Sequence, residues 1–183
     1  MTSHQTSRLI GAIFGLVFVV ANAGALPTAA AVPLRLLAIA SFVWLFIALR
    51  RARTSPAGGV GGDARPGAAP RMFGRGYVLV VAAEVVAALA GVLVVNLVLH
   101  VPQATVAWIS LVVGLHFFGL AVVWRMPALR LLAAAMAACG AAGLVLAASG
   151  ASLAVIATVA GIAPGALLLG SVRWSLRTPE DMA

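Results

Sequence analysis

The stretch 77–99, YVLVVAAEVVAALAGVLVVNLVL, is apolar along almost its whole length and carries one charged side chain, Glu84. An α-helix needs about 20 apolar residues to cross the hydrocarbon core of a bilayer. The apolar residues here are continuous rather than alternating, which favours a helix over a strand of a membrane barrel. The stretch therefore predicts a transmembrane helix with one carboxyl group inside the membrane.

Five further stretches have the same apolar character. Together with 77–99, we predict transmembrane helices over 9–26, 31–49, 104–124, 129–148 and 152–172. Composition agrees, because 63% of the 183 residues are hydrophobic and 9% are charged, against about 25% charged residues in soluble domains. The sequence therefore predicts an all-α polytopic membrane protein, in which residues 1–183 form one compact bundle of six helices.

The 12 arginines gather at alternate helix ends, and the chain has no lysine. Arg8 precedes the first predicted helix, and every other arginine except Arg35 lies in or beside the connections that follow the second, fourth and sixth helices. These arginines are Arg50, Arg51, Arg53, Arg65, Arg71, Arg75, Arg125, Arg130, Arg173 and Arg177. The connections 22–29, 100–103 and 149–151 carry no Arg, Asp or Glu. This alternation is the positive-inside pattern, which predicts that both termini are cytoplasmic. Because the positive charges lie at membrane helix ends, the net charge of +8 does not indicate a nucleic-acid-binding protein.

A single arginine, Arg35, and the arginine-rich segment 51–75 complete the expected topology. Arg35 lies near the outer end of its helix, where we expect its long side chain to reach the membrane interface. The segment 51–75 is rich in glycine, proline and arginine, and such a composition cannot offset the entropy of ordering. We expect it to be a flexible cytoplasmic loop. The alanine-rich, all-arginine composition favours a bacterial protein of the plasma (inner) membrane.

The N-terminus has a second interpretation. Arg8, the apolar run 9–20 and the tripeptide Ala21-Asn22-Ala23 resemble a secretory signal peptide. Removal of residues 1–23 would leave five helices with the new N-terminus outside. We expect the first helix to be retained, and cleavage stays open as the alternative.

Several kinds of chemistry are not expected from this sequence. Cys139 is the single cysteine, and the three histidines are His4, His100 and His116. These residues cannot form an intramolecular disulfide or a thiolate metal cluster, and no nucleotide-binding, zinc-protease or hydrolase motif is present. We therefore expect no cofactor, no metal and no catalytic residue set, and we favour a protein that is not an enzyme.

Two ionisable residues lie within the predicted spans at the same depth. Glu84 lies nine residues after Arg75, and His116 lies nine residues before Arg125, so each side chain is about 13 Å from the arginine level. Because 77–99 and 104–124 are consecutive and antiparallel, we expect the carboxylate and the imidazole to lie within about 4 Å of each other. The same count from other arginines adds Ser41, Cys139 and Pro164 to this polar layer.

The expected pair has two interpretations. An ionised carboxylate in a bilayer is costly, so Glu84 must be paired or protonated. A coupled carboxylate and imidazole titrate as one unit, as a proton relay or a proton-linked substrate site requires. An interhelical bond that only fixes the helices would look the same. The candidate substrate- or proton-binding residues are Glu84, His116, Ser41 and Asn96.

Small residues recur at four-residue spacing in three of the spans. They are Gly11 and Gly15, Gly161 and Gly165, and Ala83, Ala87 and Gly91. Such faces allow helix backbones to approach closely. Pro164 lacks the N–H that would bond the Ala160 carbonyl, so we expect a kink or local opening in the last helix.

Three functions fit these features. The first is a small transporter or small-molecule-binding bundle, whose ligand lies in the interior beside Glu84 and His116. The second is a non-catalytic membrane component that binds lipid or a partner protein, with a homo-oligomer as a further option. The third is a lipid- or isoprenoid-modifying enzyme that uses Glu84 as general acid. We favour the first, and in each case the lipid bilayer is the expected surrounding.

The topology is tested by cysteine labelling. In a Cys139→Ala background, single cysteines at Gly61 and Gln103 should react with a membrane-impermeant thiol reagent from opposite sides of the membrane. Intact cells should label the cysteine at 103, and the cysteine at 61 should react only after permeabilisation. Labelling of both positions in intact cells would contradict the six-span topology.

Overall fold

The computed structural model describes residues 3–54, 75–123 and 127–176, and within these ranges all regular structure is helical. The main helices are α1 (Ser3–Asn22), α2 (Thr28–Thr54), α3 (Arg75–Leu93), α4 (Thr105–Val123), α5 (Pro127–Ala148), α6 (Leu153–Ala157) and α7 (Ala163–Ser175). Two π-helical turns, η2 (Val94–Val98) and η4 (Thr158–Ile162), extend α3 and join α6 to α7. Two short 3-10 turns, η1 (Ala23–Ala25) and η3 (Pro102–Ala104), lie in the connections.

Six helices in the described ranges are long and apolar enough to cross a membrane. They cover Arg8–Ala25, Thr28–Arg51, Gly76–Val98, Pro102–Val123, Leu129–Ala148 and Leu153–Ser175. The last one runs through α6, η4 and α7 as a single span. The predicted all-α fold with six such helices is confirmed.

The helix α2 is longer than predicted. It begins at Thr28 and continues to Thr54, whereas the sequence predicted 31–49 followed by a loop over 51–75. Arginine has a high helix propensity, so the backbone ladder continues beyond the last apolar residue. The prediction of a loop is therefore wrong for 51–54 and for Arg75, which begins α3. Its remainder, 55–74, lies outside the described residues.

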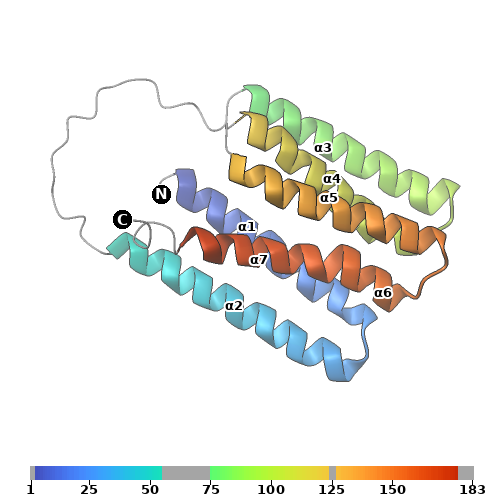
Figure 1. Cartoon of the computed structure of the whole chain (residues 1–183), viewed down its shortest axis with the longest axis horizontal. Coiled ribbons are helices and arrows are strands. Elements are labelled where there is room, and N and C mark those ends of the chain that lie inside the picture. The colour runs from blue at the N-terminus through green and yellow to red at the C-terminus, as the bar shows by residue number, and fades with distance from the viewer. Residues whose placement is uncertain (1–2, 55–74, 124–126, 177–183) are drawn as a thin grey trace.

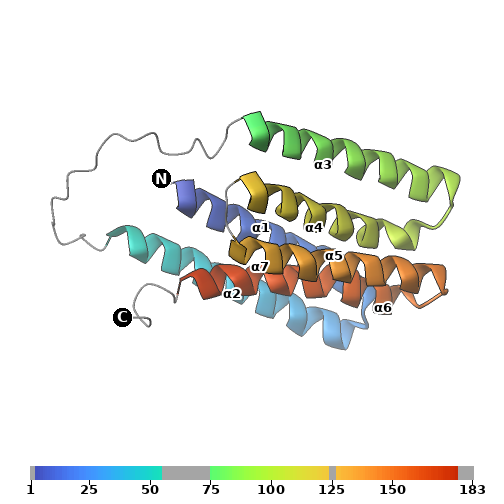
Figure 2. The ribbon, with the colours of Figure 1, turned by 45° about the horizontal axis from the view of Figure 1, so that its top comes forward.

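The helices run antiparallel in sequence, and their spatial order differs from their order along the chain (Figures 1 and 2). The helix α3 packs on α4, and α4 packs on α5. The span α6–α7 lies between α5 and α1, while α2 packs on α1 and α7. In an 18-residue window of each span, buried residues make up 44% in Leu153–Ser175 but only 6% in Gly76–Val98. The bundle is therefore less compact than predicted, with α2 and α3 as opposite edges.

The closest helix contact joins α4 to α5 through glycines. An added Cβ at Gly114 would overlap the backbone of Ala137, and one at Gly140 would overlap the backbone of Leu111. Ser110 is fully buried in this contact and donates a hydrogen bond to the Met136 carbonyl at 3.4 Å. Two helix backbones thus meet directly, with no large side chain between them.

A second close contact joins α1 to α7. An added Cβ at Gly15 would lie 2.9 Å from the Gly165 carbonyl oxygen, and one at Gly165 would lie 2.8 Å from the Gly15 oxygen. One glycine from each predicted small-residue pair therefore lies in a close backbone contact, as expected for such faces, although the sequence did not predict that the two pairs pack on each other. The local opening predicted near Pro164 is also present, because the π-helical turn η4 directly precedes α7 and its proline.

The importance of the α4–α5 contact is tested with two matched substitutions. Gly140→Ala should destabilise the folded protein by about 1–3 kcal/mol, because the new methyl group meets backbone that cannot move aside. Gly170→Ala on α7 is the control, since a Cβ there meets no atom within 4 Å. It should be neutral or stabilising by about 1 kcal/mol, from the better helix propensity of alanine. Thermal unfolding in detergent measures both, and equal effects would contradict this packing.

Candidate functional site

The interface of α3 with α4 places Glu84 opposite His116. The two helices are antiparallel, so residues later in α3 contact residues earlier in α4. The neighbours of a Cβ atom built at three glycines show this pairing: Gly76 faces Val123, Gly119 faces Val80, and Gly91 faces Trp108. Glu84 lies one turn after Val80, and His116 lies one turn before Gly119, so the register brings both polar side chains to one level.

The carboxylate and the imidazole are in close contact. Glu84 Oε2 lies 3.0 Å from His116 Nδ1, and the two side chains are 22% and 11% exposed. The predicted contact between these residues is therefore confirmed. His116 Nδ1 is buried and makes no hydrogen bond to any described residue, so the two groups are in close contact without a well-formed hydrogen bond.

The pair can exist in several protonation states. With one proton in total, it is neutral overall, either as carboxylate with imidazolium or as carboxylic acid with imidazole. Loss of that proton leaves one negative charge, and gain of a second leaves one positive charge. At a separation of 3.0 Å, one proton can lie on either of the two groups. A carboxyl group and an imidazole in contact are the side chains that a proton-transfer site would need.

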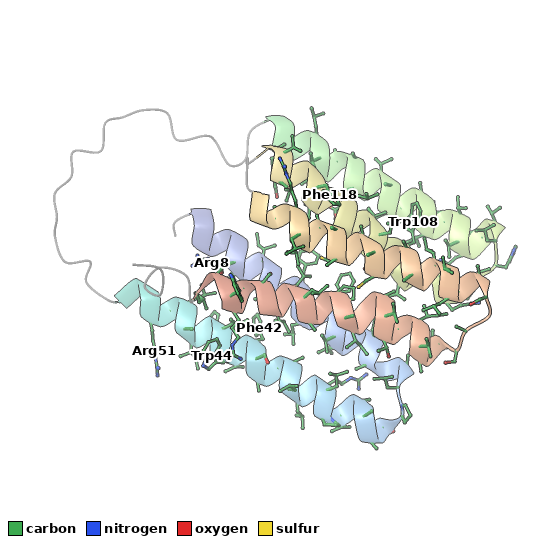
Figure 3. The ribbon with its side chains drawn as sticks, in the orientation of Figure 1. Arg8, Phe42, Trp44, Arg51, Trp108 and Phe118 are labelled. Atoms are coloured by element: carbon green, nitrogen blue, oxygen red, sulfur yellow. The ribbon has the colours of Figure 1, made fainter. Side chains whose placement is uncertain are left out.

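Trp108 makes a second contact between α3 and α4, farther from the arginine-bearing helix ends than the Glu84–His116 pair (Figure 3). The indole of Trp108 packs on Gly91, and its Nε1 donates a hydrogen bond to the Ala87 carbonyl at 3.1 Å. A Cβ at Gly91 would overlap the indole ring, which explains the glycine. The predicted small-residue face on α3 is thus confirmed at Ala87 and Gly91, whereas Ala83 is exposed.

Asn96 also joins α3 to α4, but in a different place. Its Nδ2 donates to the Val92 carbonyl at 2.8 Å and to Thr105 Oγ1 at 2.9 Å. Asn96 is twelve residues from Glu84, which corresponds to about 18 Å along the helix. This candidate residue is therefore part of a neutral interhelical bond and not of the Glu84–His116 pair.

Ser41 lies apart from the pair, so the predicted polar layer does not assemble into one site. Ser41 is on α2 and lines a groove against α7, whereas Glu84 is on α3 at the opposite edge (Figures 1 and 2). Pro164 is buried in α7, and Cys139 is half-buried on α5. Counting residues from the arginines predicted how deep these residues lie in the membrane, but it did not predict which helices are neighbours. Within the described ranges, no three His, Cys, Asp or Glu side chains are placed to hold a metal.

Arg35 has a structural partner that sequence reasoning missed. Its Nε donates a hydrogen bond to the Val20 carbonyl at 3.3 Å, and its guanidinium lies beside Gly24. Val20 is in the last turn of α1, where carbonyl groups lack helical partners and cations are favoured. Arg35 therefore caps α1 across the α1–α2 connection, rather than only extending towards the interface as expected.

No family model matches this sequence, and neither a curated protein nor a solved structure matches it. The class of protein therefore follows from the structure. Its six apolar helices indicate a helical membrane-type protein, in which a carboxylate and an imidazole meet between two helices.

The α3–α4 register is tested by a disulfide. An ideal Cβ at position 119 lies 3.6 Å from the Val80 Cβ, within the range of about 3.5–4.5 Å that disulfides require. In a Cys139→Ala background, Val80→Cys with Gly119→Cys should therefore cross-link under mild oxidation, as measured by mass spectrometry of the digested protein.

The matched control is Val86→Cys with Gly119→Cys. Val86 is 66% exposed and lies on the outer face of α3, so this pair should stay reduced. A disulfide at 86 and none at 80 would show that α3 is rotated and also shifted by about 9 Å along α4, so that Glu84 does not face His116.

Proposed function

We propose that this chain is a multi-pass protein of the bacterial plasma (inner) membrane, with cytoplasmic termini, that carries or binds a small molecule in a proton-linked manner. The described arginines support the orientation. Arg8, Arg50, Arg51, Arg130 and Arg173 lie near the helix ends that share one end of the bundle (Figure 1). Arg35 lies towards the opposite end, where it caps α1. This arrangement fits the positive-inside rule.

The observation that supports proton linkage is the 3.0 Å contact between Glu84 and His116. Within the six apolar spans, Glu84 is the acidic residue and His116 is the histidine. An acidic side chain at the centre of a span costs about 3 kcal/mol on insertion scales, whereas an interhelical hydrogen bond contributes about 0.6 kcal/mol on average. Helix association alone therefore does not offset the cost of the carboxylate.

A neutral contact in the same interface strengthens this comparison. Asn96 and Thr105 already join α3 to α4 by a hydrogen bond of 2.9 Å. Together with the Trp108 contact to Ala87, this bond holds the two helices without an ionisable group. A group that can gain and lose a proton adds something that these contacts cannot supply.

The position of Glu84 also bears on the enzyme alternative. Glu84 does not line the α2–α7 groove that contains Ser41. The alternative of a lipid-modifying enzyme with Glu84 as general acid has therefore less support, since that groove does not bring a substrate to this carboxylate.

The proposal is tested with Glu84→Gln. Glutamine has nearly the same shape as glutamate and can hydrogen-bond a histidine, but it cannot titrate, so the variant should fold and insert. Wild-type melting temperature in detergent should vary with pH between about 5 and 8, and Glu84→Gln should abolish the part of that variation due to the pair. Screening of small molecules by thermal shift across the same pH range should find a ligand whose stabilisation depends on pH only in the wild type.

Thr105→Val is the matched control, because it removes the neutral bond to Asn96 with little change of shape. It should lower the melting temperature slightly and keep the pH dependence of the wild type. If wild type and Glu84→Gln show the same pH dependence, the pair is only a structural contact, and the non-catalytic membrane component becomes the better description.

A further inference from the structure

An open groove between α2 and α7 lies away from the Glu84–His116 pair. Its volume is about 490 Å³, and its wall is mainly apolar, with Leu34, Leu37, Ile162 and Leu169 among the lining residues. Gly170 lies on its α7 side, where an added Cβ would meet no atom within 4 Å. The groove thus presents empty apolar space at the edge of the bundle, beside an edge helix.

The length of the groove corresponds to one leaflet of a bilayer. Its lining runs from Leu34 to Leu45 on α2 and from Ile162 to Arg173 on α7. At 1.5 Å per residue, either stretch is about 16 Å long, close to half of the roughly 30 Å hydrocarbon core. A lipid acyl chain of one leaflet therefore matches the groove in both length and polarity.

The two ends of the groove differ in charge. The guanidinium of Arg173 lies 5.1 Å from the centroid of the Trp44 ring, and both residues line the end nearest the arginine-rich end of the bundle. Figure 3 shows Trp44 and Arg51 on α2, with Arg8 at the same end of the molecule. Farther along α2, outside the groove lining, Arg50 lies over the Phe46 ring at 5.0 Å. The other end of the lining, at Leu34 and Ile162, is apolar.

The stacked arginine suits a phosphate group. The guanidinium of Arg173 lies over the Trp44 ring, and a guanidinium is the side-chain group best suited to bind a phosphate bidentately. Glu84 is the acidic residue within the described ranges, and it lies on α3 at the opposite edge. Arg173 therefore has no described carboxylate beside it to neutralise its charge. A hydroxyl, Ser41, lines the wall one turn from Trp44, at a depth suited to a lipid ester group.

We propose that the α2–α7 groove binds one anionic phospholipid of the cytoplasmic leaflet. Its phosphate contacts Arg173, and one acyl chain lies along the groove towards Leu34 and Ile162. Among the described residues, this end of the groove has cations and no carboxylate, so it favours a net negative headgroup over a zwitterionic one. This site uses the topology of the proposed function, but it does not depend on proton linkage at Glu84.

The test uses the full-length protein, purified in detergent, with phosphatidylglycerol as the probe and phosphatidylcholine as the zwitterionic comparison. Native mass spectrometry measures the lipid that stays bound, and thermal unfolding measures the stabilisation. Wild type should bind phosphatidylglycerol more tightly than phosphatidylcholine, and inorganic phosphate at the same pH should not stabilise it. Arg173→Gln should weaken phosphatidylglycerol binding about tenfold, as expected for loss of a charge-assisted hydrogen bond.

Two variants separate the groove from general attraction to basic surfaces. Gly170→Leu should fill the groove and reduce binding of both lipids, while circular dichroism confirms that the helices remain. If it fails to fold, Ala40→Leu places the same side chain in the groove from exposed α2 surface. Arg130→Gln removes an exposed arginine on α5 at the same end of the bundle and should leave lipid binding unchanged.

Three results would overturn the proposal. They are equal phosphatidylglycerol binding by wild type and Arg173→Gln, an equal loss in Arg130→Gln, and undiminished binding when the groove is filled. None of these results bears on the pH dependence of Glu84→Gln, so failure of the lipid site is distinguishable from failure of the proton site.

Discussion

Direct contact between helix backbones is the constraint on which the rest of this structure depends. Lipid is as apolar as the helices themselves, so helix association relies on close packing rather than on removal of apolar surface from water. Gly114 and Gly140 allow α4 and α5 to touch, and Gly15 with Gly165 does the same for α1 and α7. The span α6–α7, which contains α7 of the second pair, also packs on α4 and α5 and so joins the two pairs. The two edge helices, α2 and α3, are then added to this glycine-packed centre.

The edge helices carry the polar chemistry of the molecule because their attachment is less dense. The helix α3 is held against α4 by three contacts. They are the Glu84–His116 contact, the packing of the Trp108 indole on Gly91, and the hydrogen bond from Asn96 to Thr105. The helix α2 leaves a groove against α7. The proposed proton site on one edge and the proposed lipid site on the other are therefore independent of each other, and each has its own test.

The sequence predicted the elements better than their arrangement. Hydropathy identified the six spans, and equal distances from Arg75 and Arg125 identified the contact between Glu84 and His116, because consecutive antiparallel helices joined by a short connection usually pack together. The same count failed for Ser41, since the connection after α2 is long and lets α2 and α3 separate to opposite edges. The α4–α5 contact could not be predicted because many alanine-rich helix faces in this sequence could pack equally well. The groove could not be predicted because its lining residues come from α1, α2 and α7, which are far apart in the sequence.

Infrared spectroscopy through a pH titration tests the proton-binding pair most directly. The carboxyl stretching band of Glu84 is identified by its absence in Glu84→Gln, and its titration midpoint is compared between wild type and His116→Asn in lipid nanodiscs. If the two groups titrate as one unit, replacement of the imidazole must move the midpoint of the Glu84 band, because the carboxylate loses its coupled partner at 3.0 Å. An identical midpoint in both proteins, or a band that does not titrate in either, would contradict a coupled proton site.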